Sequence, residues 1–223
     1  MSQPLVVLGT EKLELLAAED PKVAADLCRL LIAHNLLTSL NRMYVALLKA
    51  NEPKPAQKEH AEGDRTAHFF LTVGILKEGL DVFRELDRSG WLDKEKNLRK
   101  DAEVQRLRLL LQSASDKNNR DSFYNRFIKP TRDDAVSHWR RQKIEAILAD
   151  LAVQRQERKV PPLVVGYSKK AIDFRFPIAD KLLVQLGAWP QIPGGINRAV
   201  ERVSNLAHKF REFVDHLAKV VLT

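Results

Sequence analysis

Residues 20–50 read DPKVAADLCRLLIAHNLLTSLNRMYVALLKA, and this stretch decides the fold class. Asp20 followed by Pro21 is typical of a helix start, because the carboxylate accepts hydrogen bonds from first-turn amides and proline fits the first helical position. Apolar residues then recur at the three- and four-residue steps of one helix face; they are Val23, Leu27, Leu30, Leu31, Leu37, Tyr44, Leu47 and Leu48. The stretch predicts one long amphipathic helix that ends near Ala50.

The chain on both sides of this helix also favours helical structure. Thr10 is expected to cap a short helix over residues 11–18. The prolines in segment 51–55 predict a break, and the polar residues after them predict a loop to about Gly63.

A second long helix is expected from about Asp64 to Ser89, closed by Gly90. Its apolar stripe is nearly heptad-spaced and consists of Phe69, Val73, Leu76, Leu80 and Phe83. Gly74 and Gly79 destabilise a helix relative to alanine, so they indicate a close approach by another helix.

The rest of the chain predicts further helices and little strand. Helices are expected over roughly 92–113, 120–128, 131–158 and 196–220, short β-prone segments over 163–165 and 172–177, and one more helical segment over 178–186. Glycine is scarce and strand-like alternation is nearly absent. The sequence therefore predicts an all-α, up-and-down bundle of four or five principal helices with an additional C-terminal helix. We expect residues 1–160 to form the bundle and residues 161–223 a C-terminal extension that ends in an amphipathic helix.

The composition is that of an ordinary soluble globular protein: 223 residues, 44% hydrophobic and 30% charged. Cys28 is the single cysteine, which excludes an internal disulfide and a Cys-based zinc site, and its apolar neighbours predict a small buried residue. No basic segment followed by an apolar run opens the chain, and no uninterrupted apolar stretch approaches the roughly 18 residues of a membrane span. We expect a cytoplasmic protein with no membrane association.

Positive charge is concentrated in the middle of the chain. The net charge is +8, and residues 94–170 hold nineteen Lys/Arg against ten Asp/Glu, a net of +9. A basic surface attracts nucleic acid through phosphate contacts and counterion release. The alternative is a solvated, highly charged helical surface with no such ligand.

Within this basic region, residues 129–139 read KPTRDDAVSHW. Pro130 disfavours helical geometry at the residue before it, and Thr131 with Asp134 forms a capping box. The segment therefore predicts a helix that starts at Thr131. Residues six apart differ by roughly 120° around a helix, so Arg132 is expected to meet His138 only from a frayed first turn.

Arg132, Asp133 and His138 form the candidate catalytic group. A guanidinium carries fixed positive charge and an imidazole moves protons near neutral pH, a pairing that suits phosphodiester cleavage. Similar spacings occur at Arg29/His34, Arg202/His208 and Arg211/His216. Only Arg132 opens a predicted helix and is followed by an aspartate, so we interpret the other three as incidental.

This arrangement resembles the HEPN superfamily, whose members are helical-bundle proteins and include many prokaryotic RNases. Their motif is an arginine, usually followed by a small polar residue, with a histidine four to six residues after the arginine; Arg132-Asp133 with His138 matches it. The resemblance covers about residues 20–158, with three motif residues as its specific part. The chain has no glutamate followed four residues later by lysine, a pair found in some members.

The resemblance implies a homodimer in which two such helices form one cleft. It implies metal-independent RNA cleavage, with the ribose 2′-hydroxyl attacking its own phosphate, and no cleavage of DNA. His138 would be the general acid or base, Arg132 would hold the phosphate, and Asp133 would orient either of them. No cofactor or metal is expected; the expected partners are RNA, a second copy and an antitoxin-like protein, as for a toxin or defence component.

A different class of function stays open. Arg132 could form a salt bridge with a neighbouring helix while His138 packs in the core. The protein would then be a non-catalytic helical interaction protein that forms a homodimer or docks a partner. A helical DNA-binding regulator is disfavoured because no helix-turn-helix spacing is evident.

Two other groups of residues invite a functional interpretation. His60, Arg65 and His68, with nearby glutamates, suggest a metal site, but their spacing matches no strong ligand pattern and favours a solvated helix start. The aromatic residues of the basic region are candidates for base stacking, although helical spacing favours core positions; they are Phe123, Tyr124, Phe127 and Trp139.

Overall fold

The protein is an all-α helical bundle, seen here in a computed structural model that describes residues 11–49, 55–133, 164–167, 172–175, 192 and 194–222. The helices are α1 (Glu11–Glu19), α2 (Pro21–Lys49), α3 (Pro55–Arg88), α4 (Trp91–Lys94), α5 (Lys96–Lys100), α6 (Ala102–Ser115), the π-helix η1 (Tyr124–Ile128), α7 (Lys129–Thr131) and α10 (Gly195–Leu222). Strands β1 (Val164–Tyr167) and β2 (Ile172–Arg175) pair antiparallel, with Val164 opposite Arg175. The two β-prone segments were therefore predicted correctly.

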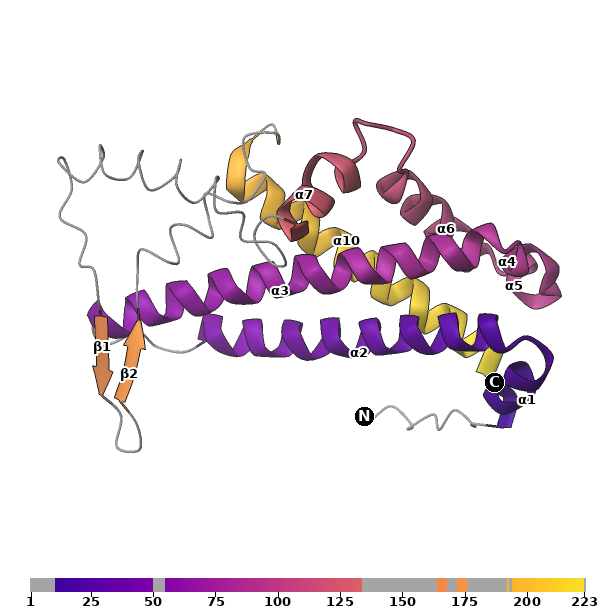
Figure 1. The fold of residues 1–223 in the computed structure, drawn as a ribbon, viewed down its shortest axis with the longest axis horizontal. Helices are drawn as coiled ribbons and strands as arrows, with labels where there is room; N and C mark the ends of the chain where they lie inside the picture. The colour runs from indigo at the N-terminus through magenta and orange to yellow at the C-terminus, as the bar shows by residue number, and fades with distance from the viewer. Residues whose placement is uncertain are drawn as a thin grey trace.

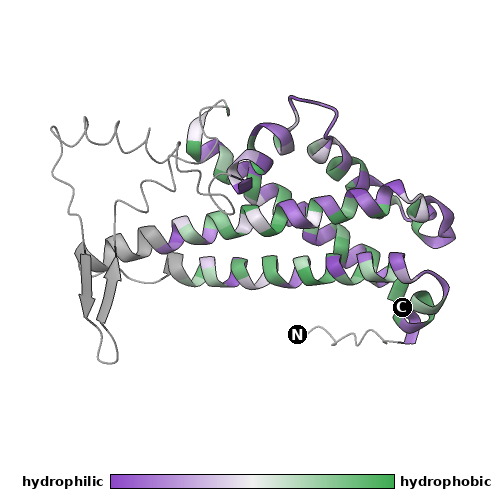
Figure 2. Cartoon of the chain, viewed as in Figure 1, coloured by the Kyte–Doolittle hydropathy of each residue, from purple (hydrophilic) through white to green (hydrophobic). Residues whose placement is uncertain are grey.

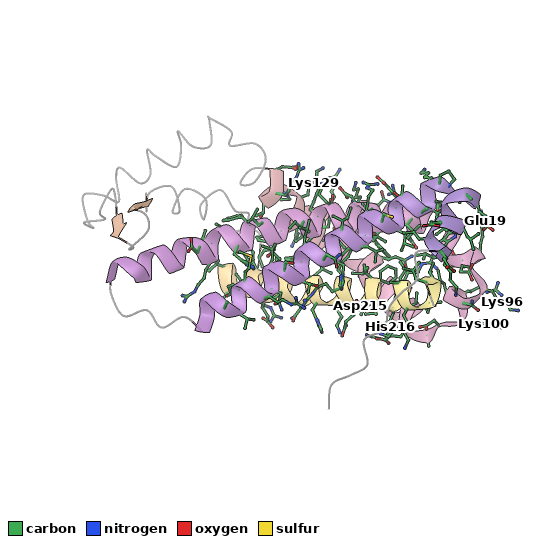
Figure 3. All side chains as sticks on the ribbon, turned by 90° about the horizontal axis from the view of Figure 1, so that it is seen from below. Glu19, Lys96, Lys100, Lys129, Asp215 and His216 are labelled. Atoms are coloured by element: carbon green, nitrogen blue, oxygen red, sulfur yellow. The ribbon has the colours of Figure 1, made fainter. Side chains whose placement is uncertain are left out.

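The long helices α2 and α3 run antiparallel, and α10 packs against both (Figure 1). Viewed from below, side chains fill the space between these three helices (Figure 3). Phe83 of α3 meets Phe213 of α10 edge to face, with ring centroids 5.2 Å apart, and both side chains are fully buried. One hydrophobic core thus joins elements from the two ends of the chain.

The C-terminal helix α10 is an integral part of this core. Its apolar stripe contributes Val203, Phe210, Phe213 and Leu217, each at most 1% exposed. The predicted domain boundary after residue 160 lies outside the described residues, as do the expected helix 178–186 and the expected helical course from 134 to 158.

The predicted helix starts and stops follow local capping chemistry. The Asp20 carboxylate accepts a hydrogen bond from the Val23 amide at 3.0 Å, at the predicted start of α2. Gly90, two residues after the last residue of α3, has the left-handed φ of 71° that its predicted capping position requires. The predicted loop up to Gly63 is wrong, because α3 already begins at Pro55. Proline suits a first helical position, and the Ala, Gln, Lys and Glu residues that follow are good helix formers.

The predicted helical region over 92–113 is confirmed, and the chain divides it into the three helices α4, α5 and α6. Glu95 and Asp101 adopt extended backbone angles and cap the helices that follow them. Asp101 accepts hydrogen bonds from the amides of Glu103 and Val104, at 3.0 and 2.9 Å. A carboxylate that bonds nearby amides competes with continued helix.

The predicted helix start at Thr131 is wrong as well. Lys129, directly before Pro130, is helical, and η1 runs into α7 through the proline. The wide turn of η1, in which the Lys129 amide donates to the Tyr124 carbonyl, makes room for a ring that would clash with the preceding turn of an α-helix. Thr131 is fully buried inside the helix. Arg132 therefore extends a continuous helix and is not at a frayed first turn.

Candidate functional site

Arg132 and Asp133 lie together at the C-terminal end of α7, beside α3. Arg132 Nη1 donates to Asp133 Oδ1 at 3.3 Å, and Arg132 Nη2 donates to Glu78 Oε1 of α3 at 3.1 Å. The Arg132 side chain is 27% exposed. His138, the third predicted catalytic residue, lies outside the described residues.

Next to this pair, Asp81 of α3 is the centre of a charged cluster. It accepts a hydrogen bond from the Tyr124 hydroxyl at 2.8 Å and pairs with Lys77 at 2.8 Å and Lys117 at 3.4 Å. Arg84 also pairs with Asp81, and its Nη1 donates to the Ser115 carbonyl at 2.7 Å. One carboxylate thus ties α3 to η1 and to the segment after α6.

Burial shifts the pKa of three side chains in this cluster. Burial lowers the pKa of the Arg84 guanidinium and of the Lys117 ammonium, because a charged cation loses its hydration there. Burial also raises the pKa of the Tyr124 phenol. The Arg84 guanidinium lies over the Tyr124 ring, 4.2 Å from its centroid. This cation–π contact joins two side chains that both bind Asp81.

An exposed apolar surface adjoins the Arg132–Glu78 pair. We call it the open face: Ile32, Leu36 and Met43 of α2 and Leu71 of α3, which are 59%, 47%, 58% and 52% exposed. Figure 2 shows hydrophobic residues along both helices. Leu71 and Glu78 are seven residues apart, two helical turns, so they lie on one side of α3. The Arg132 pair therefore lies at the edge of the open face.

Helix α2 is unusually apolar for a surface helix, and the open face accounts for this. Among the described helices, its segment Pro21–Ala46 meets the length and hydropathy of a membrane span, with 44% of the apolar window buried in the bundle. A helix that has one face in the core and another in the open face meets the same criterion. Cys28 of this helix is half-buried rather than fully buried.

The aromatic residues of the basic region that the structure describes are core residues. Phe123, Tyr124 and Phe127 are 5%, 1% and 0% exposed, so their rings do not present a surface for base stacking. The Phe123 and Phe127 rings stack on each other, with centroids 5.3 Å apart. Arg202, one of the arginines interpreted as incidental, lies over Phe123 at 4.2 Å.

The suggested metal group near the start of α3 is only partly described, because the side chain of His60 lies outside the described part of the structure. His68 Nε2 hydrogen-bonds with the Leu40 carbonyl oxygen, and Tyr44 stacks on the imidazole with centroids 5.1 Å apart. Among the described residues, no three His, Cys, Asp or Glu side chains lie close enough to hold a metal ion.

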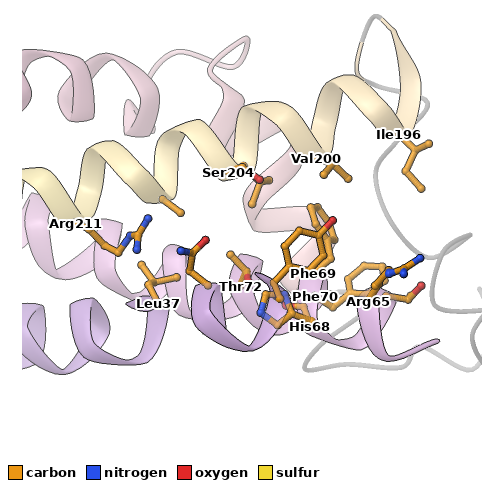
Figure 4. Close-up of a pocket in the computed structure, with 15 residues that line it drawn as sticks. Leu37, Arg65, His68, Phe69, Phe70, Thr72, Ile196, Val200, Ser204 and Arg211 are labelled. Atoms are coloured by element: carbon orange, nitrogen blue, oxygen red, sulfur yellow. Dashed lines mark hydrogen bonds between the residues drawn. The ribbon is translucent and has the colours of Figure 1, made fainter. Parts of the chain in front are cut away.

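A second candidate site, which sequence reasoning missed, lies between α2, α3 and α10 (Figure 4). This α10 pocket has a volume of about 210 Å³ and is lined by Arg65, His68, Phe69, Val203 and Arg211, among others. Arg211 was interpreted as incidental because its local sequence signal was only a spacing to His216. Its neighbours in the pocket come from α2 and α3, well over one hundred residues earlier, so no local pattern could reveal them.

Comparison with known proteins identifies no relative of this chain. No protein-family model matches the chain, and no curated protein and no solved structure is significantly similar to it. The candidate function therefore rests on the residues and contacts described above.

Proposed function

We propose that this protein is a HEPN-type RNA-binding protein and metal-independent endoribonuclease, with Arg132, Asp133 and His138 as its site. In this proposal it works as a cytoplasmic homodimer of the toxin or defence type. Arg132 binds the scissile phosphate, His138 transfers the proton, and Asp133 positions Arg132. An antitoxin-like protein is the expected partner.

The contact between Arg132 and Asp133 carries the proposal. Asp133 accepts a hydrogen bond from Arg132 Nη1, which restricts the guanidinium while 27% of the side chain stays exposed. A planar guanidinium held in place binds two phosphate oxygens without first losing side-chain freedom. The expected orienting role of Asp133 is consistent with this contact.

The open face supports the dimer. In a two-fold dimer the same surface of each copy meets its equivalent, so one apolar patch is sufficient. Arg29, about one helical turn before Ile32 of the open face, is already paired with Asp26 and Glu85, each at 2.9 Å. The charge of Arg29 at this end of the open face is therefore already neutralised, and paired or absent charge is typical of the centre of a protein interface. Association there would bring two Arg132 sites to the rim of one interface.

An RNA cleavage assay in EDTA tests the proposal. Single-stranded RNA and the matching DNA are incubated with wild type, Arg132→Ala and His138→Ala, and with Arg126→Ala as a control. Arg126 is a half-exposed arginine of η1 that pairs with the exposed Asp121. We expect cleavage of RNA alone, a loss of at least about 100-fold in the two site variants, and normal activity in the control. Cleavage that survives both site substitutions would contradict the proposal.

A second candidate function is a non-catalytic interaction protein that uses the open face. The observation in its favour is that Glu78 occupies the second Arg132 amino group, as in an ordinary interhelical salt bridge. Sedimentation velocity of wild type, Leu36→Glu and Leu109→Glu, combined with the RNA cleavage assay, separates the two functions. Leu109 of α6 is 65% exposed and lies off the open face, so it is the matched control. A dimer lost only in Leu36→Glu, with no RNA cleavage by wild type, favours this second function.

A further inference from the structure

The α10 pocket has the composition of a small-molecule site. Its walls are mostly apolar and aromatic, with Leu37 and Tyr44 from α2, Phe69 and Phe70 from α3, and Val203 from α10. Such a pocket, with a few polar groups among apolar ones, is the usual form of a site for a small organic ligand. Its volume of about 210 Å³ exceeds the ~150 Å³ of a cavity that holds benzene. A molecule of one or two rings fits this size.

The acidic and basic residues of the lining are not balanced: its described part holds arginines and no carboxylate. Arg211 of α10 and Arg65 of α3 lie at opposite ends of the pocket (Figure 4). The described lining residues include no aspartate or glutamate. A ligand in this pocket would therefore meet positive charge at each end and apolar surface between.

Arg211 has unused hydrogen-bonding capacity. Its Nε atom is buried and has no hydrogen-bond partner among the described residues. A buried charged donor without an acceptor is costly, and a carboxylate satisfies a guanidinium with two parallel hydrogen bonds. His68 is less suited to hold the ligand, because one ring nitrogen is engaged by the Leu40 carbonyl and its ring is stacked on Tyr44.

We propose that the α10 pocket binds a small aromatic acid, with its carboxylate on Arg211 and its ring between Phe69 and Val203. This site is separate from the Arg132 group and does not depend on the proposed RNase activity. The bound acid would bridge α2, α3 and α10, so it would stabilise the docking of α10 on the α2–α3 pair.

Titration calorimetry with 2-naphthoate tests the proposal on the full-length protein, with the neutral 2-naphthol as the comparison ligand. Wild type is expected to bind the acid at least tenfold more tightly than the alcohol. Arg211→Gln is expected to weaken acid binding by about 10- to 100-fold and to leave alcohol binding unchanged. Arg198→Gln is the matched control, because Arg198 is an exposed arginine of α10 that pairs with Glu201 at 2.7 Å and does not line the pocket.

A space-filling variant locates the binding site. Val200 lines the pocket, and Val200→Phe is expected to abolish binding of both ligands while circular dichroism shows an intact helical fold. The proposal is overturned if wild type binds neither ligand with a Kd below 1 mM, or if it binds the alcohol more tightly than the acid. It is also overturned if Arg211→Gln binds the acid as tightly as Arg198→Gln does, or if Val200→Phe binds it normally.

Discussion

Phe210 of α10 packs directly on Gly79 of α3: a Cβ atom at residue 79 would stand 2.6 Å from Cζ of the phenyl ring. Phe210 is fully buried, so its ring is enclosed by the core. The predicted role of Gly79, a close approach by another helix, is thus confirmed, and α10 is the helix that approaches. The close packing of α10 on α3 therefore depends on glycine, which has no side chain, at position 79.

Gly79→Ala is expected to destabilise the protein by about 1–2 kcal/mol, measured by urea denaturation. Overpacking costs about 1–3 kcal/mol, and the better helix propensity of alanine returns about 1 kcal/mol of this at most. In a Phe210→Leu background the clash is relieved, so the same substitution is expected to be neutral or stabilising. An equal loss in both backgrounds would refute the contact.

Asp81→Asn is expected to destabilise the protein by about 2–4 kcal/mol, because it leaves the buried Arg84 without its carboxylate. The loss of stability is expected to arise where α3, η1 and the segment after α6 meet, because Asp81 connects these three elements. Asp121→Asn is the control: that carboxylate is 73% exposed, and a change within about 0.5 kcal/mol is expected. Thermal unfolding of both variants beside wild type measures the difference, and similar losses would contradict the central role of Asp81.

Tyr124 is expected to make the protein sensitive to alkali. Burial raises the pKa of its phenol above the ordinary value of about 10. Because the folded-state pKa is raised, the neutral Tyr124 phenol contributes fully to stability below the unfolded-state pKa. This contribution is lost as pH rises through the folded-state pKa. The melting temperature should therefore fall above about pH 10 in wild type and fall less in Tyr124→Phe. Parallel falls in the two proteins from pH 8 to 11 would exclude this role.

Glu78 competes with RNA for Arg132, if Arg132 binds phosphate. Glu78→Gln removes a 53% exposed carboxylate and is expected to tighten single-stranded RNA binding by up to about fivefold, the worth of an exposed salt bridge. Glu85→Gln is the control, because Glu85 is a 51% exposed carboxylate of the same helix that pairs with Arg29. Fluorescence anisotropy at fixed salt compares the two. Equal gains would mean that only net charge had changed.

The failed helix start at Pro130 shows where local rules stop being sufficient. A proline normally excludes helical geometry at the residue before it, yet Lys129 is helical. Phe127 and Ile128, both fully buried, anchor the preceding turn in the core. The free energy of that burial outweighs the local preference, and a π-helical turn is the geometry that satisfies both.

The candidate site was only partly predictable for a related reason. Asp133 follows Arg132 in the chain, so their contact is a short-range one that the sequence indicated. Glu78 is 54 residues away and reaches Arg132 only because η1 and α7 pack on α3. The same holds for Arg211, whose pocket is built by three helices that are distant in sequence.

The sequence by itself determined the helical class, the capped start of α2, the end of α3 at Gly90 and the buried stripe of α10, because periodicity and capping act within a few residues. The tertiary structure decided the path through Pro130, the partner of Arg132 and the pocket at Arg211. These features depend on which helices meet, and that is set by burial of one shared core rather than by any local pattern.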